Sequence, residues 1–184
     1  MARPLLALFT LDRSALDALS AELRPLLGND DRAGVARLLG LAEALAQKLS
    51  SRPAVEWFLR TDDDAEASPF HASLRRIAKK RALEQVWVSE HPSLEGRLRA
   101  YDTLRDDARV AAAIDRALDP ARVPFFLARK GATCGLLDDG DRALLAEALG
   151  PGGSLRDDEL PPELAAFGDA LAELDGDLLL HDAL

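Results

Sequence analysis

The segment 75–81, Arg-Arg-Ile-Ala-Lys-Lys-Arg, carries five cations within seven residues. Arg75 and Lys79 stand four residues apart, as do Arg76 and Lys80, so each pair projects from one side of a helix. Guanidinium and ammonium groups clustered in this way bind phosphates or an acidic protein surface. A solvated helix face, or a face paired with the acidic residues just before it, explains the same pattern. We keep these four side chains as candidate binding residues.

The segment 130–135, Lys-Gly-Ala-Thr-Cys-Gly, combines a lysine, two glycines and the one cysteine of the chain. Its spacing does not match the phosphate-binding loop, in which Gly-Lys-Ser/Thr follows a first glycine after a fixed interval. Cys134 would act as a nucleophile if a base such as His71 or His181 lay beside it. A buried cysteine is the simpler interpretation, because free cysteine behaves mostly as a small core residue. Lys130 and Cys134 stay candidate binding residues.

Three carboxylates, Asp138, Asp139 and Asp141, precede an apolar stretch that is typical of a helix. They suggest a calcium site, but the sequence does not continue into a full calcium-binding loop with its closing glutamate. Asp138 or Asp139 fits a helix N-cap, where a carboxylate faces the positive end of the helix dipole. All three are kept as candidate binding residues. The histidines show no zinc-ligand spacing, so we expect neither a metal nor a cofactor.

Most of the chain that surrounds these residues shows apolar side chains at helical spacing. Asp12 is placed to cap a helix that begins at Arg13, and Pro25 should end that helix. Asp30 or Asp31 is placed to cap the next one. Further helices are expected over residues 31–49, 53–58, 70–89, 92–104, 107–117, 139–149 and 161–174.

The predicted fold is mainly α. We expect an irregular bundle of seven to eight helices, with a minor two-stranded β element made of residues 5–10 and 124–136. A run of glycine and proline follows Gly150 and breaks the chain there. Residues 1–150 are predicted to form a helical core domain, and residues 151–184 an acidic C-terminal helix and tail packed on it, within one domain overall. The apolar residues 178–180 of this tail should dock on the core or on a partner.

The charge of the chain is uneven. The net charge is -9, and residues 138–184 hold thirteen acidic residues against two arginines. Such an acidic region repels nucleic acid and suits either solubility or a basic partner. A single cysteine excludes an internal disulfide, and no apolar run is long enough to span a bilayer. We therefore expect a cytoplasmic protein that contacts no membrane, with nucleic-acid binding unlikely.

These observations favour a non-catalytic protein that binds another protein with a basic surface, in the manner of an antitoxin, an immunity protein or a regulatory binder. The absence of any catalytic motif or cofactor fingerprint in the sequence argues against an enzyme. The alternative hypothesis is a small enzyme or small-molecule-binding protein with a site at the loop from Lys130 to Asp141. It requires a concave pocket around Cys134 or the three carboxylates.

Overall fold

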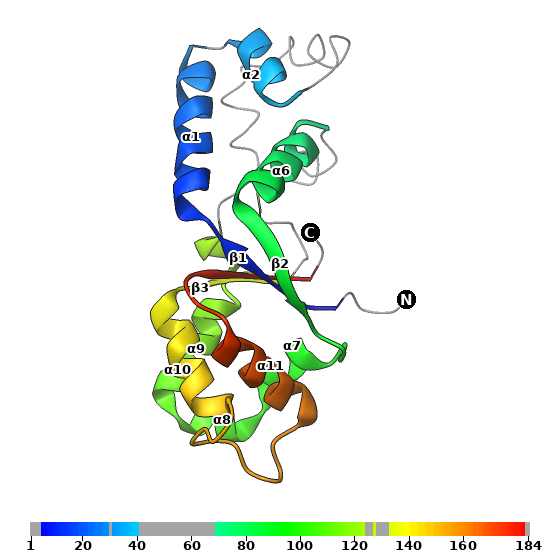
Figure 1. The fold of residues 1–184 in the computed structure, drawn as a ribbon, viewed down its shortest axis with the longest axis vertical. Helices are drawn as coiled ribbons and strands as arrows, with labels where there is room; N and C mark the ends of the chain where they lie inside the picture. Colours follow the sequence, from blue (N-terminus) through cyan, green and yellow to red (C-terminus); the bar gives the residue numbers. More distant parts are fainter. Residues whose placement is uncertain (1–4, 30, 41–68, 124–126, 128–132, 183–184) are drawn as a thin grey trace. The chain divides into compact units, whose positions relative to one another are not determined.

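The computed structural model describes residues 5–29, 31–40, 69–123, 127 and 133–182 (Figure 1). The chain divides into two compact units. Unit 1 comprises Met1–Leu11, Glu84–Pro124 and Gly131–Leu184, and unit 2 comprises Asp12–Leu83 and Phe125–Lys130. Residues on both sides of Gly150 thus belong to the same unit.

Unit 1 is built on a four-stranded sheet in the order β2-β1-β4-β3. The strands are β1 (Ala7–Leu11), β2 (Leu83–Val88), β3 (Cys134–Leu137) and β4 (Leu178–His181). β4, one of the two inner strands, runs antiparallel to both of its neighbours, β1 and β3. All four of its residues are buried, as are those of β3.

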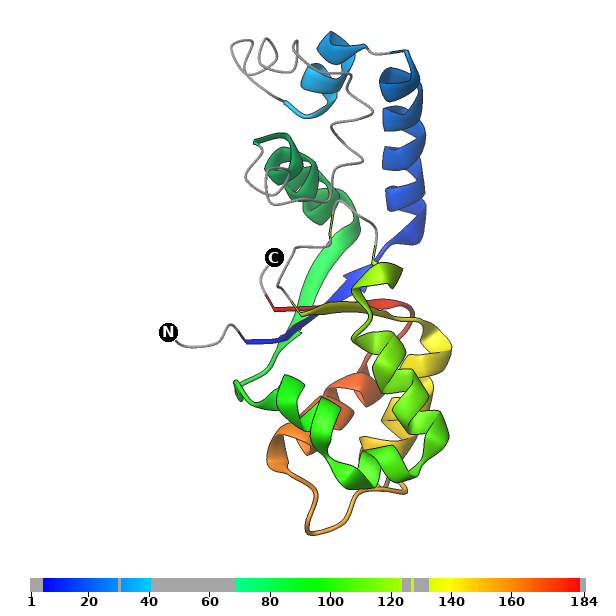
Figure 2. The same ribbon diagram turned by 180° about the vertical axis from the view of Figure 1, so that it is seen from behind.

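Five helices cover one face of this sheet (Figures 1 and 2). They are α7 (Leu94–Ala100), α8 (Asp102–Asp106), α9 (Ala108–Ala117), α10 (Asp139–Leu149) and α11 (Pro162–Glu173), and a 3-10 turn, η2 (Pro120–Arg122), follows α9. The sheet contributes Leu8, Leu137 and Leu180 to the core shared with the helices. From α11, Phe167 is fully buried, and its ring lies 6.0 Å from the ring of Trp87 on β2, between centroids, in a tilted arrangement.

In unit 2, the described residues form three helices, α1 (Arg13–Gly28), α2 (Arg32–Leu38) and α6 (Pro69–Ala82). Asp12 and Asp31 cap α1 and α2 through their carboxylates, as predicted. Pro25 does not end α1, which continues to Gly28. Proline lacks only its own N–H donor, and its carbonyl still accepts the backbone N–H of Asn29 at 3.0 Å. The predicted helix at 53–58 and residues 41–49 of the one predicted at 31–49 lie outside the described residues, and within the described part α2 ends at Leu38.

The prediction of a helical bundle with a minor two-stranded element is wrong. The described part of the chain holds eight α-helices and a four-stranded sheet, a mixed architecture that is mainly helical. Of the predicted strand 5–10, residues 7–10 lie in β1, which pairs with β4. Of the predicted partner segment 124–136, residues 134–136 lie in β3, which also pairs with β4 and not with β1. The apolar residues 178–180, which we expected to dock on the core or on a partner as part of the tail, belong to strand β4. The helix predicted over 70–89 ends at Ala82, where β2 begins.

Candidate functional site

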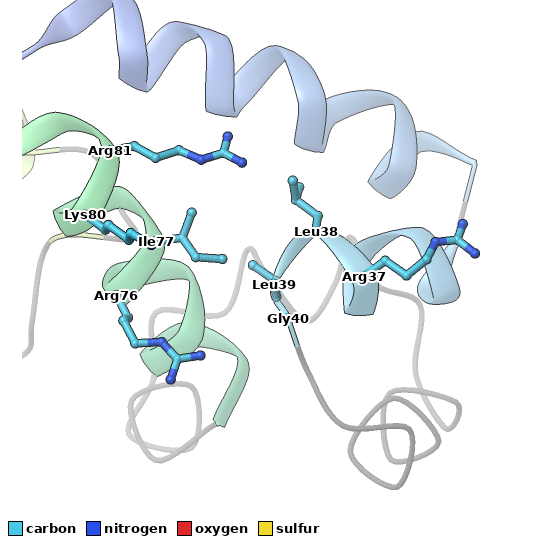
Figure 3. Close-up of a pocket in the computed structure, with 8 residues that line it drawn as sticks. All are labelled: Arg37, Leu38, Leu39, Gly40, Arg76, Ile77, Lys80 and Arg81. Atoms are coloured by element: carbon cyan, nitrogen blue, oxygen red, sulfur yellow. The ribbon is translucent and has the colours of Figure 1, made fainter.

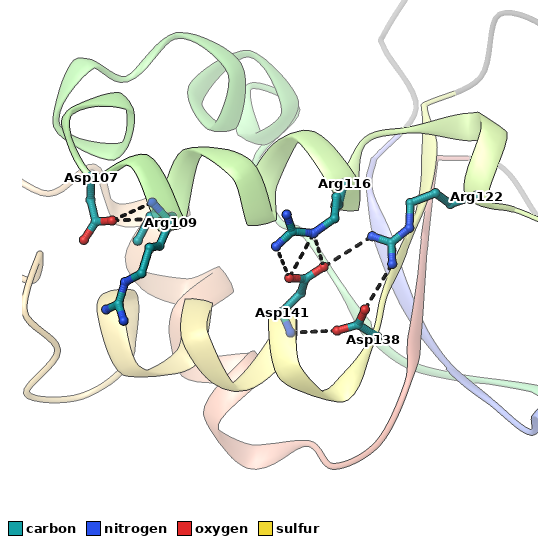
Figure 4. Close-up of polar contacts among 7 residues, drawn as sticks. Asp107, Arg109, Arg116, Arg122, Asp138 and Asp141 are labelled. Carbon is teal, nitrogen blue, oxygen red and sulfur yellow. Dashed lines mark hydrogen bonds and ion pairs between the residues drawn. The ribbon is translucent and has the colours of Figure 1, made fainter.

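The carboxylates predicted at the start of α10 lie in an ion-pair network (Figure 4). Asp141 is 6% exposed and accepts hydrogen bonds from Arg116 of α9, with Nε 2.9 Å from its Oδ2. Arg122 of η2 bridges the two acids, with Nη1 3.3 Å from Asp141 and Nη2 3.0 Å from Asp138. Asp138 also caps α10 by accepting the backbone N–H of Asp141 at 2.8 Å. The network therefore ties α9 and η2 to the start of α10.

The hydrogen bonds of this network stabilise the ionised form of Asp138. The backbone N–H of Asp141 and the guanidinium of Arg122 lower the pKa of Asp138 from its ordinary value of 3.8 and outweigh the opposing effect of burial. The Asp141 carboxylate, in turn, raises the pKa of Arg116. An ionised N-cap is what the positive end of α10 favours.

Asp139 also has a structural role. Its Oδ1 pairs with Arg142 one turn along α10 at 2.8 Å and accepts the backbone N–H of Gly176 at 3.2 Å. Its own N–H donates to Asp177 just before β4. The three candidate carboxylates thus hold the start of α10 in place, and the predicted N-cap is confirmed at Asp138.

Cys134 lies on β3, directly opposite His181 of β4 in the antiparallel register. The structure therefore brings together the cysteine and one of the two histidines that the nucleophile hypothesis required. Their exposed fractions are 1% and 0%, so a substrate has no access to the pair. Cys134 is a core residue, as the simpler interpretation predicted. Lys130 and the side chain of His71 lie outside the described structure.

The basic residues of α6 divide into two groups. Arg75 and Lys79 are half-buried, whereas Arg76 and Lys80 are exposed and make no ion pair or hydrogen bond within the described part of the chain. Arg76 and Lys80 line a cavity of about 510 Å³ between α2 and α6 (Figure 3). This α2–α6 cavity is lined by Arg37, Leu38, Leu39, Gly40, Arg76, Ile77, Lys80 and Arg81.

The α2 side of the cavity was not found from the sequence. Gly40 has a φ of +59°, a left-handed conformation that glycine adopts without strain, and it turns the chain just after α2. Leu38 and Leu39, at the end of α2, lie opposite Ile77 of α6 (Figure 3). Arg37 is exposed and, like Arg76, makes no described ion pair. A lone arginine before a turn carries no sequence pattern that would link it to the α6 residues.

The surface of unit 1 is strongly acidic. Unit 1 holds 21 acidic and 9 basic residues, a net charge of -12, whereas unit 2 holds 11 acidic and 14 basic residues, a net charge of +3. Seven of the eight described arginines of unit 1 are used in internal ion pairs. These pairs are Arg97–Glu163, Arg99–Glu95, Arg105–Asp115, Arg116–Asp141, Arg122–Asp138, Arg142–Asp139 and Arg156–Asp169.

Ten exposed carboxylates of unit 1 have no ion pair within the described residues. They are Glu84, Glu90, Asp102, Asp106, Glu147, Asp157, Asp158, Glu159, Glu173 and Asp175. Three of them, Asp157, Asp158 and Glu159, are consecutive in the connection between α10 and α11. We refer to these three as the acidic loop.

The acidic loop is held in place from both sides. Before it, Arg156 forms an ion pair with Asp169 of α11 and donates to the carbonyl of Leu149 at 3.1 Å. After it, Leu160 is 8% exposed and belongs to the core. The hydroxyl of Tyr101 donates to the carbonyl of Glu159 at 3.3 Å. The backbone of the loop is therefore fixed, while its three carboxylates face solvent.

The described residues contain no group of side chains able to hold a metal ion. Among them, no helix is both long and apolar enough to cross a lipid bilayer. Comparison of the chain with protein-family models, curated proteins and solved structures finds no match.

Proposed function

We propose that the chain is a non-catalytic cytoplasmic binding protein that uses the acidic surface of unit 1 to bind a basic protein partner. One observation carries this proposal. Every described arginine of unit 1 except Arg109 forms an ion pair with a carboxylate of the same unit. Ten exposed carboxylates form no ion pair within the described residues. The net charge of the unit is therefore strongly negative, and such a field steers a basic partner into contact.

The acidic loop is the point of first contact in this proposal. Asp157, Asp158 and Glu159 present three adjacent carboxylates on a backbone that Arg156 and Tyr101 hold in place. A fixed loop loses little conformational freedom on binding, so more of the electrostatic attraction contributes to affinity. Repulsion of phosphates by the same carboxylates favours a protein partner over a nucleic acid.

The alternative of an enzyme at the Lys130–Asp141 loop receives no support from the described geometry. Cys134 is buried, and Asp138, Asp139 and Asp141 are engaged in caps and ion pairs. A catalytic carboxylate or thiol has to reach its substrate, and these groups are occupied or enclosed.

A pull-down from a lysate of the native host, read by mass spectrometry, tests the proposal. We expect a basic protein to be retained at low salt and lost at high salt, because exposed charges are screened within about 10 Å at 0.1 M salt. Asp157→Asn/Asp158→Asn/Glu159→Gln should weaken retention, since it removes the charges and keeps the hydrogen-bond acceptors.

Asp102→Asn/Asp106→Asn/Glu173→Gln is the matched control, because it removes the same charge from exposed positions elsewhere on unit 1. It should weaken retention less than the loop variant does. Recovery of the bait alone, or equal retention by the loop variant and the wild type, would contradict the proposal. Sedimentation velocity at both salt concentrations separates a different partner from a second copy of the chain.

A further inference from the structure

The α2–α6 cavity combines charged and apolar walls in a way that the acidic surface of unit 1 does not explain. Its three apolar side chains, Leu38, Leu39 and Ile77, lie between the two helices, and Arg37 and Arg76 lie at its margins (Figure 3). No acidic residue is among the described residues that line it. We propose that this cavity binds a small organic phosphate, with the phosphate against the cations and the organic group against the apolar side chains.

The charge of the cavity suits a phosphate. Arg81 is neutralised by Glu22, with Nη1 3.0 Å and 3.1 Å from the two carboxylate oxygens. Arg37, Arg76 and Lys80 have no such partner within the described residues, and all three are exposed. Arg37, Arg76 and Lys80 extend from different sides of the cavity (Figure 3), and each can donate charge-assisted hydrogen bonds to a phosphate oxygen placed near it.

The helix dipole explains only part of this arrangement. Arg37 lies in the last turn of α2 and Lys80 in the last turn of α6, where cations offset the negative end of a helix. Each helix end counts for only about half a negative charge. The charge of the three cations therefore exceeds the negative partial charge of the two helix ends. The helix dipoles also do not explain why a cavity lies between α2 and α6.

The size of the cavity points to a ligand larger than inorganic phosphate. A volume of about 510 Å³ falls within the range of roughly 300–1,000 Å³ that is typical of small-molecule sites. Leu39 is fully buried and Ile77 is half-buried, so the apolar wall is part of the packed structure of unit 2. An aromatic or aliphatic group placed against it would bury further apolar surface.

Isothermal titration calorimetry on the full chain tests this proposal, with ATP, phenyl phosphate and inorganic phosphate as probes in low salt without divalent cations. At least one of the two organic phosphates should bind more tightly than inorganic phosphate. Arg76→Gln/Lys80→Gln should weaken that binding at least about tenfold, because it removes two cationic hydrogen-bond donors.

Arg24→Gln/Arg109→Gln is the matched control, because it removes two other exposed arginines without a described ion pair and gives the same change of charge. It should bind as the wild type does. Ile77→Ser should weaken binding of the organic phosphate and leave inorganic phosphate unchanged. All of these side chains are at least partly exposed, so circular dichroism should show the native fold in each variant.

Three results would overturn the proposal. The first is no binding of ATP or phenyl phosphate at millimolar concentration. The second is equal weakening by the cavity variant and the control. The third is binding of a single-stranded DNA oligonucleotide more than about a hundredfold tighter than ATP, which indicates an extended nucleic-acid surface instead. None of these results bears on the acidic loop, which belongs to the other unit.

Discussion

Gly135 of β3 packs directly against the carbonyl group of Ala117 at the end of α9. A Cβ at position 135 would lie 1.6 Å from the Ala117 oxygen and 2.3 Å from the carbonyl carbon. Both are backbone atoms, so no side-chain rotation relieves the collision. The absence of a side chain at this position allows α9 to approach β3 within unit 1.

Gly135→Ala should therefore destabilise the protein by about 2–3 kcal/mol, the range expected for overpacking a well-packed core. Urea unfolding followed by circular dichroism measures this effect. Gly96→Ala is the matched control, because a Cβ there meets no atom within 4 Å and the residue lies inside α7. It should leave the free energy of unfolding unchanged or raise it by up to about 1 kcal/mol. Equal effects of the two substitutions would contradict the packing argument.

Asp141→Asn should destabilise unit 1 by about 1–2 kcal/mol, because it leaves Arg116 and Arg122 without their buried carboxylate partner. Arg116 is itself 46% exposed, and screening by water keeps the effect moderate. Asp115→Asn removes a carboxylate that pairs with Arg105 and is 68% exposed. This control substitution should lower the free energy of unfolding by no more than about 0.5 kcal/mol. Thermal unfolding of both variants measures the difference, and a reversed order would show that the network is dispensable.

The fall in the free energy of unfolding at acid pH should depend in part on protonation of Asp138. Folding lowers its pKa below 3.8, so the ionised group contributes stability above that pH and loses the contribution as pH falls through the lower, folded-state value. Asp138→Asn keeps an N-cap acceptor but has no proton to gain, so its loss of stability below about pH 4 should be shallower than that of the wild type. Urea midpoints at several pH values between 7 and 3 test this. Identical slopes for variant and wild type would rule out the linkage.

Cys134 should resist alkylation in the native protein, because its side chain is enclosed and the reactive thiolate has to be accessible. Iodoacetamide at neutral pH, followed by intact-mass measurement, should show modification only after denaturant is added. The denatured chain serves as the control for intrinsic reactivity. Rapid modification of the folded protein would reopen the enzyme hypothesis for the pair formed with His181.

Local chemistry made several features predictable from the sequence. The caps at Asp12, Asp31 and Asp138 depend on a carboxylate and the backbone amides two or three residues later, so a short segment contains all the information. The same holds for Arg76 and Lys80, which share a helix face because they are four residues apart. Their place at a cavity was not predicted, because the other wall of that cavity comes from α2.

Features that depend on distant partners were not predictable in this way. β2 follows α6 without a break, and its residues are a strand because they pair with β1, far earlier in the chain. β4 is too short to show a clear alternation, and its burial comes from β1 and β3 on either side. Arg37 reaches the cavity through the packing of unit 2, which no local pattern encodes. In each of these cases, contacts with residues distant in the sequence determine the local structure or the position of the side chain.

The pairing of β1 with β4 places residues 7–11 beside residues 178–181 at the centre of the sheet. Synthesis must therefore reach Leu178 before the sheet can close, because β4 is the strand to which both β1 and β3 are hydrogen-bonded. A product that stops earlier would present two unpaired strand edges, which chaperones and proteases engage readily. Only a chain that includes β4 can therefore cover both of those edges.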